Sequence, residues 1–93
     1  MAEPVRIVVQ ATPNPHAIKL TLNRTVSVEG KTYRGDPAAV DAAWAKALLG
    51  IPGVVGVYAV TNFISINKAP EAAWETIVPQ AQSALTRLFS AQE

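Results

Sequence analysis

Hydrophobic and polar residues alternate in two short segments near the start of the chain. A two-residue period is typical of a β-strand with one better-buried face. The apolar phases of the two segments are Val5, Ile7 and Val9 in the first and Ile18, Leu20 and Leu22 in the second. Residues 12–15, with the sequence TPNP, lie between them and predict a rigid polar loop, because each proline fixes its own φ and biases the preceding residue away from helix.

Two later apolar runs predict a β-hairpin. Residues 54–60 are rich in valine, and residues 63–66 contain Phe63 and two isoleucines. Thr61 and Asn62 separate the runs, and we expect Asn62 to take the left-handed conformation of a tight turn. Val26 and Val28 either extend the sheet or fill a loop, and residues 30–35, with two glycines and two cations, predict a polar surface turn.

Two segments carry the period of an amphipathic helix. The Asp36-Pro37 pair predicts a helix start, and the helix is expected to run to about Leu49, before Gly50. The buried stripe of this helix is predicted to hold Val40, Ala43, Trp44, Ala47 and Leu48. A second helical region opens at Pro70 and places Trp74 on its apolar stripe. Pro79 interrupts this region, so we expect a short turn up to about Val78 and a second helix starting near Pro79.

These elements predict one α+β domain over residues 1–93. The expected order is β-β-α-β-β-α, with a mostly antiparallel four-stranded sheet and two helices packed on one face. The opposite face of the sheet is then at least partly available. A chain of 93 residues buries a small core, so we expect a small stability margin.

Composition narrows the function classes. Hydrophobic residues make up 49% of the chain and charged residues 16%, which suits a folded domain. The net charge is +1 and there is no Lys/Arg run, which argues against a nucleic-acid or anionic-membrane surface. No segment is apolar enough to span a membrane, and residues 1–10 do not resemble a signal peptide. We therefore expect a cytoplasmic protein, and we expect it to be a monomer.

The chain contains no cysteine and one histidine, His16. Disulfides, thiolate nucleophiles and thiolate ligation of zinc or an iron–sulfur cluster are therefore excluded, so any iron–sulfur cluster would have to be bound by a partner. His16 is the one candidate metal ligand, but no acid lies close to it in the sequence, which favours a solvated loop histidine. The sequence also lacks a phosphate-binding glycine loop and a nucleophile elbow, so we do not expect an enzyme.

The polar residues of the first loop have two interpretations. Thr12 and Asn14 either satisfy backbone groups within a tight connection or present polar atoms to a partner on a preorganised loop. Lys19 lies on the polar phase of its strand, where it is either solvated or contacts an acidic partner. Trp44 and Trp74 are predicted to be core residues.

Four segments, in order, resemble the Nfu/NifU N-terminal domain. Residues 12–20, TPNPHAIKL, resemble the family hallmark Thr-Pro-Asn-Pro-Asn-x-x-Lys-Phe. Residues 47–54, ALLGIPGV, are similar to its helix end followed by Ile-x-Gly-Val. Residues 62–68, NFISINK, are similar to its Asp-Phe-Ile-Thr-Val-Thr-Lys strand, and residues 74–79, WETIVP, to its Trp-x-x-Leu-Lys-Pro helix entry. The resemblance extends over about residues 6–89.

The resemblance implies a role in iron–sulfur cluster assembly or delivery. In this family a separate C-terminal domain with Cys-x-x-Cys carries the cluster, and the N-terminal domain mediates contacts with partners. It implies an adaptor that docks iron–sulfur assembly or target proteins through Thr12, Asn14, His16 and Lys19 and the adjoining sheet. His16 departs from the hallmark, which more often has asparagine there. The alternative hypothesis is a weak iron or small-ligand site formed by His16 and nearby oxygen atoms.

Overall fold

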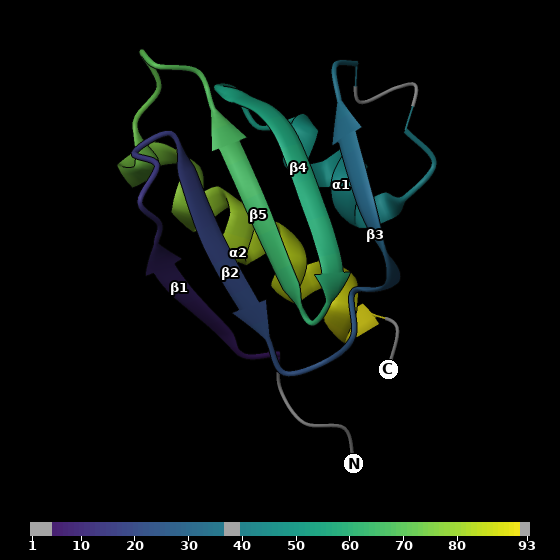
Figure 1. The fold of residues 1–93 in the computed structure, drawn as a ribbon. Coiled ribbons are helices and arrows are strands. Elements are labelled where there is room, and N and C mark those ends of the chain that lie inside the picture. The colour runs from purple at the N-terminus through teal and green to yellow at the C-terminus, as the bar shows by residue number, and fades with distance from the viewer. Residues whose placement is uncertain (1–4, 37–39, 92–93) are drawn as a thin grey trace.

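The sheet of this protein has five strands, all antiparallel to their neighbours, in the order β1-β2-β5-β4-β3 (Figure 1). The computed structural model describes residues 5–36 and 40–91. The elements in chain order are β1 (Ile7–Ala11), β2 (Ala17–Leu22), β3 (Ser27–Arg34), α1 (Ala43–Leu49), β4 (Val54–Thr61), β5 (Phe63–Lys68) and α2 (Trp74–Ala91).

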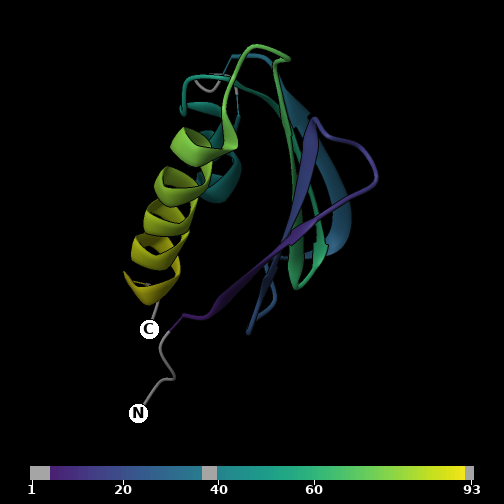
Figure 2. The ribbon, with the colours of Figure 1, turned by 90° about the vertical axis from the view of Figure 1, so that its left-hand side faces the viewer.

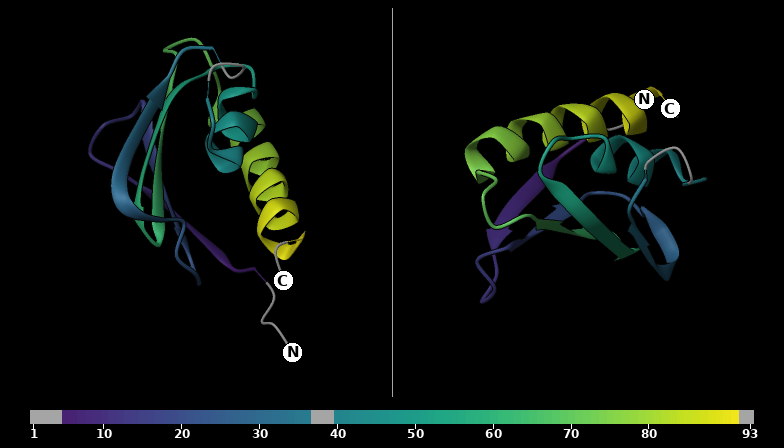
Figure 3. Two further views of the ribbon diagram at one scale, coloured as in Figure 1. Left: turned by 90° about the vertical axis from the view of Figure 1, so that its right-hand side faces the viewer. Right: turned by 90° about the horizontal axis from the view of Figure 1, so that it is seen from above.

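Both helices lie on the same side of the sheet, so the sheet has one covered and one open face (Figures 2 and 3). The core between the two layers holds the inward phases of β2, β4 and β5 and the apolar stripes of the helices. Its largest fully buried side chains are Leu20, Leu48, Val57, Ile64, Ile66, Ile77 and Leu85. The predicted α+β class and the placement of both helices on one face are therefore confirmed.

The prediction of four strands is wrong, because residues 27–34 form a fifth. The predicted surface turn over residues 30–35 lies mostly within β3, and only Gly35, with φ of +86°, turns the chain. Strand β3 is at the edge of the sheet and pairs with β4 alone. Most of its side chains are exposed, so the sequence has no apolar alternation to indicate a strand.

Helix α1 begins later than the sequence predicts. Its first residue is Ala43, and the residue before it, Ala42, is extended and makes no side-chain cap. The predicted start at Asp36 is therefore wrong, and Pro37 lies outside the described residues. Val40, which was predicted to lie on the buried stripe of the helix, packs against the core from the connection that precedes it, as does Ala42. The prediction that Ala43 is on this stripe is wrong, because Ala43 is exposed and the buried residues of α1 are Trp44, Ala45, Leu48 and Leu49.

Pro79 does not divide the second helical region, as the sequence analysis expected. It lies inside the continuous helix α2, in the second turn, and its side chain is exposed. The side-chain amide of Gln80 donates a hydrogen bond of 2.7 Å to the carbonyl of Thr76, close to the point where proline lacks an N–H. Pro79 is the sixth residue of α2, beyond the first turn, so the helix loses the one backbone hydrogen bond that this position would donate and still continues through it.

The β4–β5 hairpin is confirmed, but its left-handed residue is not the predicted Asn62. Thr61 has φ of +52°. Asn62 instead joins the turn to β2, because its backbone carbonyl accepts from the Leu22 amide and its side-chain amide donates to the Leu22 carbonyl. Among the residues that the structure describes, no helix is long and apolar enough to cross a membrane.

Candidate functional site

The loop between β1 and β2 is held in one conformation by its own polar groups. The Thr12 hydroxyl accepts a hydrogen bond of 3.2 Å from the Asn14 amide and lies within donating distance of the carbonyls of Asn14 and Ala17. The Asn14 side-chain oxygen accepts from the His16 amide at 2.9 Å, and the Asn14 carbonyl accepts from the Ala17 amide at 3.1 Å. The side-chain oxygens of Thr12 and Asn14 therefore order the loop, as one of the two interpretations predicts.

The loop is also fixed to distant parts of the chain. The His16 carbonyl accepts a 2.9 Å hydrogen bond from the Lys68 amide at the end of β5. The Pro15 carbonyl accepts a 3.0 Å hydrogen bond from the indole Nε1 of Trp74, the first residue of α2. Trp74 is half-buried, so its predicted core role is only part of what it does. Its indole N–H positions the loop relative to the helix layer.

The turn before β4 reaches the same end of the sheet. Gly53 has φ of +97°, and a Cβ built there would lie 2.6 Å from the Cβ of Ala72. Its carbonyl accepts a 2.8 Å hydrogen bond from the Ala69 amide, just after β5. Lys68 places its Nζ 5.6 Å from the centre of the Trp74 ring. Parts of all four segments quoted in the sequence analysis thus meet at this end of the molecule.

The structure separates the four predicted partner-binding residues into two groups. Thr12, Asn14 and His16 lie in the loop, where Thr12 is half-buried and the other two are exposed. Lys19 lies within β2, on the open face of the sheet, and its backbone pairs with Gln10 and Ser65. Its Nζ is 4.7 Å from the centre of the Phe63 ring.

The open face carries an aromatic pair that the sequence analysis did not assign to a site. The rings of Tyr58 and Phe63 are 6.2 Å apart and inclined by 53°. Both side chains are half-buried. The alternation within β5 could have predicted that Phe63 lies on the open face, because Phe63 is in phase with Ser65 and out of phase with the buried Ile64.

Two strand glycines leave room for long side chains to lie along this face. A Cβ at Gly30 would lie 2.8 Å from the hydroxyl of Tyr58, and a Cβ at Gly56 would lie 3.3 Å from the Cγ of Arg34. Tyr58 and Arg34 therefore lie across the backbones of the neighbouring strands. Because Gly30 and Arg34 were predicted to be parts of a turn, neither contact was expected from the sequence.

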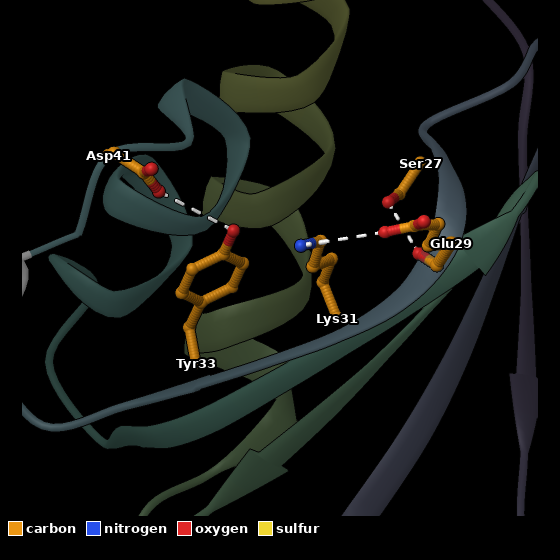
Figure 4. A network of polar contacts seen from close by, with 5 residues as sticks. All are labelled: Ser27, Glu29, Lys31, Tyr33 and Asp41. Atoms are coloured by element: carbon orange, nitrogen blue, oxygen red, sulfur yellow. Dashed lines mark hydrogen bonds and ion pairs between the residues drawn. The ribbon is translucent and has the colours of Figure 1, made fainter.

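The covered side of β3 has a different charge pattern, shown in Figure 4. There the Nζ of Lys31 is 3.7 Å from a carboxylate oxygen of Glu29, and the Tyr33 hydroxyl is 3.5 Å from a carboxylate oxygen of Asp41. The Tyr33 ring also meets the buried Trp44 edge to face, 5.6 Å between centres. Acidic groups of β3 and of the segment before α1 thus lie on the helix side of the sheet.

No clustered set of metal ligands is present in residues 5–36 and 40–91, since no three His, Cys, Asp or Glu residues lie together there. His16 is exposed, and the hydrogen bonds described above use its backbone. His16 is therefore not part of a cluster of three possible metal-ligating residues within the described residues.

Comparison with known proteins gives one family. The model described as scaffold protein Nfu/NifU N terminal matches residues 7–92. Conserved virulence factor C from Staphylococcus aureus is 30% identical over 79 residues, which are 84% of this chain and 21% of that protein. The mitochondrial NFU1 iron–sulfur cluster scaffold homolog of Drosophila sechellia is 32% identical over 83 residues, which are 87% of this chain and 29% of that protein. The chain therefore spans less than a third of the length of these relatives.

Solved structures show the same fold. The crystal structure of protein SAV1430 from Staphylococcus aureus has a TM-score of 0.73 at 29% identity, over 86% of this chain and 98% of that one. The solution structure of SeR13 from Staphylococcus epidermidis has a TM-score of 0.64 at 26% identity, over 89% of this chain and 98% of that one.

Proposed function

Because this chain belongs to the family of Nfu/NifU scaffold protein N-terminal domains, we propose that it acts in iron–sulfur cluster biology as a non-catalytic adaptor. In this role it docks cluster assembly or target proteins, and the metal ions or cluster are carried by those partners. The similarity to a relative named as an iron–sulfur cluster scaffold homolog supports the proposed link with iron–sulfur clusters. The chain itself has no cysteine with which to ligate a cluster.

The observation that carries the adaptor proposal is the fixed loop of residues 12–16. Its side chains and carbonyls bond to one another, to β5 and to Trp74, so little conformational entropy is lost when a partner binds. The exposed imidazole of His16 projects from this fixed backbone, and Lys19 continues the surface onto the open face of the sheet. A preordered polar loop beside an uncovered sheet suits protein recognition better than catalysis, since these residues form no group of interacting acids and bases.

The test is affinity capture from a native lysate under anaerobic conditions, with the bound proteins identified by mass spectrometry. The loop variant is His16→Ala/Lys19→Ala, because neither side chain makes the hydrogen bonds that order the loop. The control is Lys46→Ala/Arg87→Ala, two exposed residues of the helix layer. Circular dichroism verifies that both variants are folded.

We expect the wild type and the control to recover iron–sulfur assembly or client proteins, and the loop variant to recover about tenfold less. Recovery of no iron–sulfur protein by the wild type would contradict the role. Equal recovery by all three proteins would remove the loop from the docking surface. A saturable shift of the His16 ring during anaerobic titration with ferrous iron would instead support the alternative of weak iron binding.

A further inference from the structure

The open face of the sheet has an ordered pattern of side chains in three rows that cross the strands. The row nearest the β4–β5 turn holds Val8, Thr21, Phe63 and Val60. The middle row holds Gln10, Lys19, Ser65, Tyr58 and Thr32, and the third row holds Ala17, Asn67, Gly56 and Arg34. The first row is mostly apolar, the middle row is mostly polar, and Lys19 and Arg34 in the last two rows are the cations.

The apolar row is accessible. Val8 is 56% exposed, and Val60 and Phe63 are half-buried although no helix or strand of the described residues covers this face (Figure 2). Val60, Phe63 and the neighbouring Tyr58 form an apolar group, and Val8 lies on the other side of Thr21 in the same row. Such a row is a place where a partner gains stability by removing apolar surface from water.

The charges on this face have one sign. Among the outward positions of the described strands the charged residues are Lys19 and Arg34, and no carboxylate is present there. Glu29, the one acidic residue within a described strand, is on the covered side, where it pairs with Lys31. The face is therefore complementary to a negatively charged partner.

From this arrangement we infer that the open face binds an acidic amphipathic segment of a partner protein. Its apolar side chains cover the row of Val8, Phe63 and Val60, and its carboxylates reach Lys19 and Arg34. The inference rests on the proposed adaptor function and names the chemistry of the partner that the adaptor recognises.

The distance between Lys19 and Arg34 also sets the spacing expected between the acidic residues of the partner segment. Lys19 and Arg34 are separated by three strand spacings and two residues along the strands, which is about 16 Å between their backbones. A partner chain covers this span with about five residues if it is extended, or about eleven if it is helical.

Two other occupants fit this face less well. A second copy of the chain, placed face to face, brings Lys19 and Arg34 of both copies together, and like charges oppose such a contact. Single-stranded nucleic acid stacks on open aromatic faces, but here the Phe63 ring lies beneath the Lys19 ammonium and is tilted against Tyr58.

The experiment is a selection of random linear peptides displayed on phage against the whole chain. Enriched peptides are then synthesised, and their dissociation constants are measured. Binding positions are mapped from amide chemical shifts. The test variant is Lys19→Glu/Arg34→Glu, and the control, Lys46→Glu/Arg87→Glu, changes the net charge equally on the helix layer. Lys19→Gln/Arg34→Gln provides a neutral variant in case charge reversal disturbs folding.

We expect peptides rich in Asp and Glu with interspersed aromatic or aliphatic residues, and shifts centred on Thr21, Phe63 and Ser65. The test variant is expected to bind them about tenfold or more weakly, the neutral variant to show a smaller loss, and the control to bind as the wild type does. A neutral or basic consensus, shifts on the helix layer, no enrichment, or equal binding by the charge-reversal variant would overturn the inference.

Two further outcomes would also overturn it. One is a dimer in sedimentation that occupies the open face, and the other is binding of an oligothymidine strand that shifts Tyr58 and Phe63. The result of the peptide selection does not depend on the result of the capture experiment. Acid-selective binding without recovered iron–sulfur proteins would retain this surface and refute the iron–sulfur role, whereas the reverse pair of results would refute only the surface.

Discussion

The two faces of the sheet are built from the same strands but have different tasks. On the covered face β2 and β5 contribute Leu20 and Ile64, both fully buried beneath the helices. On the open face the residues that directly precede them, Lys19 and Phe63, contact one another and remain partly exposed. Because the two-residue period of a strand places neighbouring side chains on opposite faces, we expect substitutions at adjacent positions to change either stability or the proposed recognition.

The sharpest form of this comparison is the pair Leu20→Ala and Lys19→Ala. Removing the fully buried Leu20 side chain should lower the free energy of unfolding by about 3 kcal/mol, through lost transfer energy and the cavity left behind. Lys19→Ala should cost less than about 1 kcal/mol, because it removes one contact of a cation with an aromatic ring. Urea denaturation measures both. Equal losses would contradict the division between the faces.

The turn at Gly53 should show the next largest effect. Gly53→Ala should destabilise by about 2 kcal/mol, because alanine disfavours positive φ and its Cβ would meet Ala72 at 2.6 Å. Gly50→Ala is the matched control, since Gly50 has an ordinary helical φ of −75°. Thermal unfolding of the two variants checks the prediction. A loss at Gly50 as large as that at Gly53 would show that the left-handed turn is not the cause.

The smallest expected effect concerns the attachment of the loop. Trp74→Phe keeps an aromatic ring but removes the N–H that reaches the Pro15 carbonyl, so stability should fall by about 0.5–1 kcal/mol. Hydrogen exchange of the Ala17 amide, which bonds within the loop, should become faster. Trp44→Phe, in the core, is the control. It should not increase exchange at the Ala17 amide beyond what its effect on global stability explains. Unchanged exchange in Trp74→Phe would show that the indole does not hold the loop.

Much of the fold could be predicted from the sequence because its central elements have one buried face. The alternation of Ile18, Leu20 and Leu22 gave β2, and the helical spacing gave Trp44 and Leu48 of the α1 stripe but not the buried Ala45 and Leu49. Strand β3 was missed for the opposite reason. Its backbone pairs with β4 at the edge, where few side chains need to be apolar, and a glycine within it resembles a turn signal.

The ordered loop of the candidate site could be predicted from the sequence, but the contacts that attach it to the rest of the chain could not. The two prolines around Asn14 indicated a fixed loop, but no local pattern indicates that Trp74, 59 residues away, bonds to Pro15. The placement of Lys19 beside Phe63 likewise depends on the pairing of β2 with β5, which is a long-range contact. Family resemblance identified the segments, and the tertiary structure showed that they meet at one end of the sheet.

We propose that this chain recognises iron–sulfur proteins through its loop and the adjoining open face. The most direct measurement is quantitative anaerobic capture with four folded proteins, which are the wild type, His16→Ala/Lys19→Ala, Lys19→Glu/Arg34→Glu and the helix-layer control Lys46→Glu/Arg87→Glu. We expect the wild type and the control to recover the same iron–sulfur proteins, and the other two variants to recover about tenfold less of them. Equal recovery by all four proteins, or loss only in the helix-layer control, would contradict it.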